Sequence, residues 1–363
     1  MRIMYCIPTL EHGGAERQLS YLTVELARKG HEIHAVFSRE GANLDRMRAG
    51  GVASHRLPQA GNHDPKNFFN LLKLIRSVKP DIIQTSLPQM DVLGGGAALA
   101  SGVRWVLKES SSAFAYPAHW KSRLRTVLTR RADAIVSNSQ AGDAYWRAKR
   151  VGCPRYVIPN GIPLDEIAEA RPADGAPGLA FAPGDKLVLY AGRMDDGKNV
   201  ENLVVALSRV ATDVPFTALL CGDGLLRPKL ERLVAELGLK HRIVFTGNVA
   251  NLWSLMKRAD AFALLSRFEG RPNVVLEAMA CGCPLVVSDI PAHREILDER
   301  SACFADPDEP AEIAEALKTT LLSGGAARAR ANVAQARVAE WTIRGMAERY
   351  EEVYLRVLEE GRA

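Results

Sequence analysis

Two glutamates eight residues apart, Glu269 and Glu277, form the most informative pattern in the chain. Pro272 suits the first turn of a helix and Gly282 suits its end, so Glu269 is expected in the preceding loop and Glu277 inside the helix. The neighbours of Glu277 are apolar, and burying a carboxylate among them is costly unless a partner donates hydrogen bonds to it. A ribose diol would donate two. An arginine or a neighbouring helix end would also satisfy the carboxylate, and the spacing leaves these alternatives open.

Two basic residues, Arg193 and Lys198, lie five positions apart between a predicted strand at 187–191 and a predicted helix. In open α/β sheets, ligands bind beyond the carboxyl ends of the strands, where helix N-termini favour anions. A guanidinium and an ammonium in such a loop would together neutralise a diphosphate. The alternative is a pair of ordinary exposed basic residues.

The elements that would position these residues form two alternations of strand and helix. The first half begins with a strand, a glycine-containing loop, a helix and a second strand over residues 2–37, which is a βαβ start. Its later strands are predicted at 82–84, 105–107, 134–136 and 156–158. In the second half, strands at 187–191, 217–221, 243–246, 261–265 and 285–288 alternate with helices at 200–210, 228–237, 252–258 and 273–280. Each half therefore predicts an α/β domain with a doubly wound parallel sheet.

The chain length and one composition break predict the domain boundaries. A chain of 363 residues exceeds the size at which single cores usually stop growing, and residues 166–184 are rich in Ala, Gly and Pro. We expect an N-terminal domain over 1–165, a C-terminal domain over 166–340 and a cleft between them. The last helix, within 341–363, is expected to pack back on the N-terminal domain.

The composition, 47% hydrophobic and 25% charged, is that of a globular protein. The N-terminus lacks the pattern of a secretory signal, and no apolar run approaches the roughly 20 residues that span a bilayer, so a cytoplasmic location is expected. The six cysteines are scattered through apolar runs, which favours reduced thiols. Cys281 and Cys283 lack a second pair of ligands at zinc spacing.

Basic residues are concentrated in the first half of the chain. Residues 1–165 carry 23 Lys and Arg against 13 Asp and Glu, whereas the remainder carries 24 against 29. The densest cluster, residues 120–131, mixes cations with apolar side chains as a helix on a membrane surface does. We expect this stretch to contact an anionic membrane, at the inner face of which the protein would be peripheral. A solvated helix with ordinary basic residues is the alternative, and no nucleic-acid partner is expected.

Ordered motifs along almost the whole chain resemble those of glycosyltransferase family 4, the glycosyl transferases group 1. The two-glutamate motif reads EGRPNVVLEAMACGCPLVVSD from Glu269, and the arginine-lysine loop reads YAGRMDDGKN from Tyr190. The resemblance also covers GGAERQL near the start, VSNSQ at 136–140, VIPNGI at 157–162, CGDG at 221–224 and the helix that follows Trp341. It implies the GT-B fold, in which two Rossmann-like domains face a central cleft.

The resemblance also implies a donor site for a nucleotide sugar. Arg193 and Lys198 would hold the diphosphate, Glu277 the ribose, and Glu269 with the backbone of 270–274 the sugar and distal phosphate. The base would lie against residues 246–249, and the glycines near the N-terminus would close over the donor because a backbone without side chains can approach phosphate. The donor-site residues carried over are Gly13, Gly14, Arg193, Lys198, Asn248, Val249, Glu269, Gly270, Arg271, Asn273, Val274 and Glu277, and those expected to act in catalysis are Glu269, Arg193 and Lys198.

The reaction implied is transfer of a hexose with retention of configuration, without a metal or other cofactor. Arg193, Lys198 and helix N-termini would stabilise the charge on the departing diphosphate. Asp195 and Asp196 are accordingly expected to begin the next helical turn and not to bind a metal. UDP is the preferred nucleotide, and the acceptor expected is a glycan or a lipid-linked molecule in polysaccharide or glycoconjugate biosynthesis.

The acceptor side departs from the family pattern. Many relatives place a histidine after the strand that is predicted here at 105–107, whereas this chain continues with Lys108 and Glu109. We expect Lys108, Glu109 or His119 to fill that place. The segment 289–295 lacks the paired glycines that relatives often carry there, which leaves the contacts at the edge of the donor site open.

Three other functions remain as alternatives. A nucleotide-sugar epimerase would share the fold but convert the nucleotide sugar without an acceptor. A Rossmann oxidoreductase is disfavoured because the Gly13 loop lacks the G-x-G-x-x-G spacing. A non-catalytic protein that kept the fold is disfavoured because Arg193, Lys198, Glu269 and Glu277 are present together.

Overall fold

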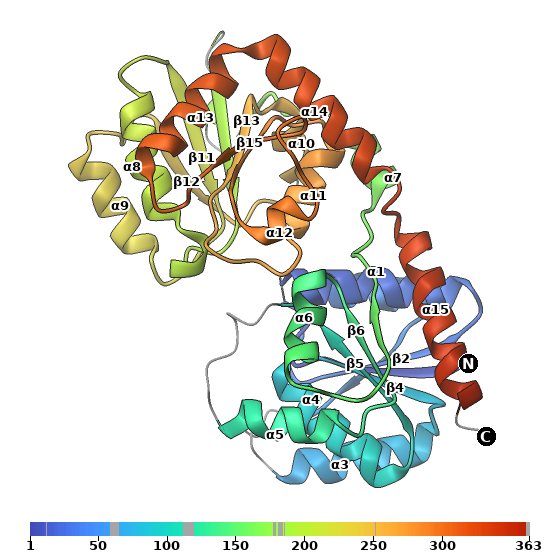
Figure 1. Cartoon of the computed structure of the whole chain (residues 1–363). Helices are drawn as coiled ribbons and strands as arrows, with labels where there is room; N and C mark the ends of the chain where they lie inside the picture. Colours follow the sequence, from blue (N-terminus) through green and yellow to red (C-terminus); the bar gives the residue numbers. More distant parts are fainter. Residues whose placement is uncertain are drawn as a thin grey trace. The chain divides into compact units, whose positions relative to one another are not determined.

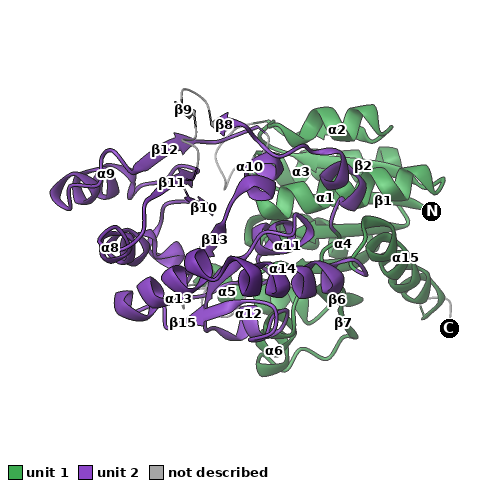
Figure 2. Ribbon diagram, turned by 90° about the horizontal axis from the view of Figure 1, so that it is seen from above, with its two compact units in different colours: residues 1–161, 341–363 green, residues 162–340 purple. Residues whose placement is uncertain are grey.

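The computed structural model describes residues 1–11, 13–58, 65–111, 120–176, 179–180, 184, 186–250 and 252–360. The chain divides into two compact units (Figure 2). Unit 1 consists of residues 1–161 and 341–363, and unit 2 consists of residues 162–340. The last residues of the chain therefore belong to the same unit as the first, and the division after Gly161 falls a few residues before the position expected from the sequence.

Unit 1 is built on a parallel sheet with the strand order β3-β2-β1-β4-β5-β6-β7 (Figure 1). Its strands are β1 (Arg2–Cys6), β2 (Glu32–Phe37), β3 (Ala53–Arg56), β4 (Ile82–Ser86), β5 (Arg104–Glu109), β6 (Ala134–Ser137) and β7 (Arg155–Val157). Its helices are α1 (Gly14–Arg28), α2 (Asn43–Ala49), α3 (Pro65–Val78), α4 (Pro88–Ser101), α5 (Trp120–Thr129), α6 (Gln140–Ala148) and α15 (Ile343–Glu360).

The central strand β1 separates two hydrophobic cores. Ile3 and Tyr5 face the core that contains residues of α1 and α15, whereas Met4 and Cys6 face the core that contains residues of α3, α4 and α6. Successive side chains of a strand point to opposite faces of the sheet, so a strand covered on both faces is apolar throughout. This explains why the run IMYC predicts a buried parallel strand.

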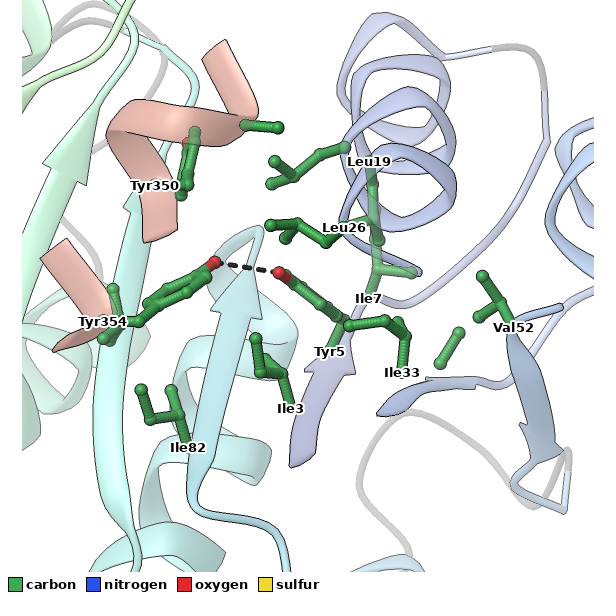
Figure 3. Close-up of a cluster of buried hydrophobic side chains, with 14 of the residues drawn as sticks. Ile3, Tyr5, Ile7, Leu19, Leu26, Ile33, Val52, Ile82, Tyr350 and Tyr354 are labelled. Carbon is green, nitrogen blue, oxygen red and sulfur yellow. Dashed lines mark hydrogen bonds between the residues drawn. The ribbon is translucent and has the colours of Figure 1, made fainter. Parts of the chain in front are cut away.

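The C-terminal helix α15 packs against α1 and the sheet (Figure 3). The Tyr354 hydroxyl donates to Gln84 Oε1 on β4 at 2.6 Å, so its 3.0 Å contact with the Tyr5 hydroxyl requires Tyr5 to donate. On the outer side, Glu351 binds Lys29 Nζ at 2.6 Å and His31 Nε2 at 2.7 Å. Polar contacts on both sides of an apolar face thus fix the register of α15 on unit 1.

Unit 2 has a second parallel sheet, with the strand order β12-β11-β10-β13-β14-β15. Its strands are β10 (Lys186–Ala191), β11 (Phe216–Cys221), β12 (Ile243–Gly247), β13 (Ala261–Leu264), β14 (Leu285–Ser288) and β15 (Cys303–Ala305), and β8 (Gly175–Ala176) pairs with β9 (Leu179–Ala180) separately. Its helices are α7 (Leu164–Glu169), the 3₁₀ turn η2 (Asp196–Lys198), α8 (Val200–Val210), α9 (Arg227–Glu236), α10 (Leu252–Arg258), α11 (Asn273–Ala280), α12 (Pro291–Arg294), α13 (Pro310–Leu322) and α14 (Gly324–Val338). Strand order reverses at β10, which pairs with both β11 and β13.

The structure corrects several sequence-based boundaries. The composition break predicted from residue 166 begins inside α7. β3 and β15 were not predicted, because the polar sequence of β3 and the short run of β15 lack a clear apolar period. β5 continues through Lys108 and Glu109, which the sequence placed after the strand. In the described part of the chain, no helix is both long and apolar enough to cross a membrane.

Candidate active site

An ion pair joins the two loops that the sequence singled out in unit 2. Lys198 Nζ lies 2.5 Å from Glu269 Oε1, and the two side chains are 21% and 12% exposed. The Ser266 hydroxyl donates to the same carboxylate oxygen at 2.7 Å. Lys198 ends η2 after β10, and Glu269 follows β13, the neighbouring strand. The carboxyl ends of adjacent parallel strands therefore bring a cation and a carboxylate into contact at the rim of the sheet.

Arg193 extends from the same loop into solvent. Its side chain is 82% exposed, and its Nε lies 3.6 Å from Asp195 Oδ2, too far for a hydrogen bond. The Asp195 side chain instead accepts from Lys198 N at 3.1 Å, so it caps η2. The prediction that Asp195 and Asp196 begin the next helical turn is confirmed, since Asp195 caps η2 and Asp196 is its first residue. An exposed guanidinium on a capped turn is able to reorient toward an incoming anion.

Glu277 lies inside α11 with a side chain that is almost completely buried. Its Oε2 accepts a hydrogen bond from Trp253 Nε1, on α10, at 2.9 Å. Trp253 was not predicted as a partner of Glu277. The spacing of residues 252–258 does not distinguish a tryptophan that only packs in the core from one that also donates a hydrogen bond. The buried carboxylate thus has a neutral donor as one partner, as its apolar surroundings require.

Backbone segments at the carboxyl ends of β10 and β11 approach each other closely. Gly222 has a φ of +123°, and a Cβ atom there would lie 2.1 Å from Gly192 O. Only glycine fits this position. Gly222 N also donates to Gly247 O at 2.8 Å, which ties the end of β11 to that of β12. The predicted base-binding residues Asn248 and Val249 follow directly, the first exposed and the second half-buried.

The remaining predicted donor-site residues lie at the start of α11 or in unit 1. Arg271 is buried, and its Nη1 lies 3.6 Å from Glu295 Oε1. Gly270 is buried just before it, while Asn273 and Val274 are the half-buried first residues of α11. Gly13 and Gly14 lie in unit 1, as the N-cap and the first residue of α1. The unit 2 residues Arg193, Lys198, Asn248, Val249, Glu269, Gly270, Arg271, Asn273 and Val274 therefore all lie at or just beyond the carboxyl ends of β10, β12 and β13.

Glu109 is part of a buried ionic cluster in unit 1. Its carboxylate accepts from Arg125 Nη2 at 2.8 Å and Trp146 Nε1 at 3.1 Å, and Arg125 Nε also donates to Asp91 at 2.7 Å. Burial of Asp91 raises the pKa of its carboxyl to about 6. Glu109 is fully buried and its carboxylate is occupied, and removing one of its partners would leave an uncompensated buried charge, so we assign it to this cluster and not to contact with an acceptor.

Lys108 is also buried, inside β5 and not after the strand as predicted. Its side chain is 2% exposed, and its Nζ lies 5.4 Å from the centre of the Tyr350 ring. Burial lowers the pKa of its ammonium group to about 8. No surface of Lys108 is available to an acceptor in this conformation. The third candidate on the acceptor side, His119, lies outside the described residues.

The basic stretch 120–131 contains all of α5 and the two residues that follow it, and the residues of the helix divide between two faces. Trp120, Leu124 and Val127 are exposed, and the spacing of these positions places them on one side of the helix. Arg125, which was predicted to be one of the surface cations of the stretch 120–131, is buried and forms part of the ionic cluster with Asp91 and Glu109. Lys121 and Arg123 of α5 are exposed cations, and so are Arg130 and Arg131 directly after the helix.

Two family descriptions match the chain over adjoining regions. Residues 12–166 match Glycosyltransferase Family 4, and residues 176–337 match Glycosyl transferases group 1. Together they span most of unit 1 and almost all of unit 2.

Two of the curated relatives come from Campylobacter jejuni. One is named N-acetylgalactosamine-N,N'-diacetylbacillosaminyl-diphospho-undecaprenol 4-alpha-N-acetylgalactosaminyltransferase, and it is 32% identical over 218 residues, which are 59% of this chain and 58% of the relative. The other is named GalNAc-alpha-(1->4)-GalNAc-alpha-(1->3)-diNAcBac-PP-undecaprenol alpha-1,4-N-acetyl-D-galactosaminyltransferase, and it is 26% identical over 77% of each chain. The first match thus spans less than two thirds of its relative.

Solved structures share the fold over nearly the whole chain. HepE of Anabaena, solved in complex with UDP and glucose, is 21% identical with a TM-score of 0.86, over 97% of this chain and 99% of that one. Sucrose-phosphate synthase of Thermosynechococcus elongatus is 21% identical with a TM-score of 0.82, over 99% and 100%. These similarities confirm the predicted GT-B fold, and both matched family descriptions are of glycosyltransferases. With two parallel α/β units, each matched by one of these family descriptions, the chain belongs to glycosyltransferase family 4, the glycosyl transferases group 1.

Proposed function

We propose that the protein is a retaining, metal-independent glycosyltransferase that moves a hexose from a UDP-sugar to a glycan or lipid-linked acceptor. The observation that carries this proposal is the Lys198–Glu269 ion pair at the carboxyl edge of the unit 2 sheet. An anionic ligand that takes the ammonium group releases the carboxylate to accept hydrogen bonds from sugar hydroxyls. A single exchange of partners thus prepares contacts to the phosphate and to the sugar.

In the proposed reaction, the bond from the sugar C1 to the diphosphate oxygen breaks, and a bond from C1 to the acceptor oxygen forms on the same face. The proton of the acceptor hydroxyl passes to the departing diphosphate. Negative charge grows on the departing diphosphate. Lys198 and the exposed Arg193 supply two positive charges for it, and preorganised cations of this kind are worth several kcal/mol, about 3, in the transition state. These residues would do what a metal ion does in other transferases.

The proposed donor and acceptor draw on the named relatives. UDP is favoured because HepE was solved with UDP and glucose. A lipid-linked acceptor is favoured because both Campylobacter relatives are named for undecaprenol diphosphate substrates. The same relatives are named as transferases, so the epimerase alternative is not favoured.

Turnover with a lipid-linked glycan acceptor should require a UDP-sugar and should persist in excess EDTA, because the diphosphate charge is neutralised by side chains. The assay measures UDP release, and NMR of the product measures the anomeric configuration. Strong inhibition by EDTA that manganese restores would contradict metal independence, and an inverted anomer would contradict retention. Conversion of the UDP-sugar to its epimer without an acceptor would favour the epimerase.

The outward face of α5 is the proposed contact with the inner face of the membrane. Replacing Trp120, Leu124 and Val127 together by Ser should lower binding to vesicles rich in phosphatidylglycerol at least about 10-fold, because it removes the apolar side chains that would enter the interface. Cosedimentation at low and high salt measures it, and the cationic part should weaken with salt. Leu225→Ser, at a highly exposed leucine in unit 2, is the matched control and should bind as wild type does. Absence of wild-type binding at low salt would refute the membrane contact.

A further inference from the structure

A chain of hydrogen bonds runs behind Glu269, from α12 through the ends of β14 and β13. His293 Nδ1 lies 2.8 Å from Ser288 O and 3.2 Å from Ser288 Oγ. The Ser288 hydroxyl donates to Ser266 O at 2.6 Å, and the Ser266 hydroxyl donates to Glu269 Oε1 at 2.7 Å. The residues are up to 27 positions apart in sequence but follow one another across neighbouring strands.

The number of available protons fixes the direction of this chain. Ser288 has one hydroxyl proton, and Ser266 O, a carbonyl, takes it. Ser288 O is also a carbonyl and can only accept. Both contacts of His293 Nδ1 therefore require a proton on Nδ1, so the imidazole is the donor that starts the chain. Every step then points toward the Glu269 carboxylate.

His293 is completely buried, and the structure leaves its other nitrogen unsatisfied. Nε2 has no hydrogen-bond partner among the residues that the structure describes. Burial lowers the pKa of the ring, which favours the neutral form with a proton on Nδ1 alone. An unpaired acceptor in a dry position opposes folding, and an apolar side chain of similar size would avoid this cost. Stability alone thus gives no reason for a histidine here.

We propose that His293 is a positioning residue for Glu269, which acts through Ser288 and Ser266 to orient the carboxylate toward the donor sugar. This role rests on the proposed function, in which Glu269 binds the sugar. Without the imidazole, the Ser288 hydroxyl is no longer held by a donor on its other side, so its bond to Ser266 O, which anchors the Ser266 loop to β14, is less well oriented. The Ser266 hydroxyl then orients the Glu269 carboxylate less precisely. Displacement of a reacting or binding group by about 1 Å is enough to cost about 100-fold in rate.

The test compares His293→Leu with His293→Asn. Leucine fills a similar volume without a donor, whereas the asparagine amide places an N–H group close to the position of Nδ1. The measured quantities are the dissociation constants of a UDP-sugar and of UDP, and the kcat and KM of transfer. Leucine should weaken UDP-sugar binding about 10-fold and leave UDP binding within about 2-fold, because Glu269 contacts the sugar and not the nucleotide. Asparagine should retain both affinities within about 3-fold.

Ser288→Ala provides a second route that does not alter the buried ring. It removes the hydroxyl in the middle of the hydrogen-bond chain. The ratio of UDP-sugar affinity to UDP affinity should fall as far as it does in His293→Leu. In the double variant this ratio should be no lower than in either single variant. A parallel loss of both affinities, additive effects, or wild-type discrimination in His293→Leu would overturn the role of His293. A folded wild-type protein that binds no nucleotide sugar would overturn the proposed function itself.

Discussion

Replacing Lys198 by Ala is expected to lower kcat/KM for transfer by about 10³-fold, because it removes a cation aimed at the charge that develops on the departing diphosphate. The loss should appear mainly in kcat, since a contact that strengthens as the bond breaks stabilises the transition state more than the bound donor. The structure adds a second reason, namely that Lys198 holds Glu269 at 2.5 Å and so fixes the carboxylate that would meet the sugar.

The melting temperature separates this effect from unfolding. The Lys198–Glu269 pair is partly exposed and Glu269 keeps the Ser266 hydroxyl as a partner, so Tm should change by no more than about 2 °C. Lys186→Ala is the matched control, because Lys186 also pairs with a carboxylate, that of Asp260. Lys186 is the first residue of β10, so this pair lies at the amino end of the strand, away from the Lys198–Glu269 pair. That variant should turn over within about 2-fold of wild type. Equal rates for the two variants would refute the assignment of Lys198.

The sequence predicted the contact between the Lys198 and Glu269 loops because parallel α/β topology places the carboxyl ends of neighbouring strands together. Once 187–191 and 261–265 were identified as strands of one sheet, the loops that carry Lys198 and Glu269 had to share an edge. Because β10 and β13 are neighbouring strands, the loops that follow them lie close enough for Lys198 and Glu269 to form an ion pair. The general location thus followed from periodicity and topology alone.

The partners of these residues could not be predicted in the same way. Trp253 reaches Glu277 from another helix, and Ser288 reaches Ser266 from another strand, so each contact depends on side-chain packing between distant segments. The spacing of residues in the sequence does not predict which tryptophan or serine side chain points into the interior. For the same reason the sequence did not predict a role for His293, which lies in the segment 289–295 that departs from the family pattern.

The main errors of the sequence-based prediction concern charged residues that are buried in the structure. Lys108 and Glu109 resemble the start of a loop because charges are rarely buried without partners, yet β5 continues through both. Arg125 makes this possible for Glu109, since it lies between Glu109 and Asp91 in a closed cluster. The three residues are 34 positions apart at most, and only the fold shows that their charges compensate one another.

Replacing Glu277 by Gln is expected to weaken binding of UDP by about 10- to 100-fold while the protein remains folded. The carboxylate is buried and takes the Trp253 indole N–H on Oε2. In the proposed complex the ribose hydroxyls also donate to it, and a hydrogen bond to a charged group contributes about 1.5–3 kcal/mol. Glutamine has the same shape but offers one oxygen, so one donor then faces an amide N–H.

The affinities of UDP and of a UDP-sugar, measured by calorimetry, should fall by the same factor, because the ribose is common to both ligands. This parallel loss distinguishes Glu277 from His293, whose replacement should affect only the sugar-bearing ligand. Trp253→Phe keeps an aromatic side chain but removes the indole N–H, and it should weaken binding of both ligands about 3-fold, since the carboxylate loses one orienting donor but keeps its charge. Glu201→Gln, at an exposed glutamate that pairs with Lys229 on the same unit, is the matched control and should bind as wild type does. Wild-type affinity for UDP in Glu277→Gln would place the ribose elsewhere, and a selective loss of UDP-sugar binding would assign Glu277 to the sugar.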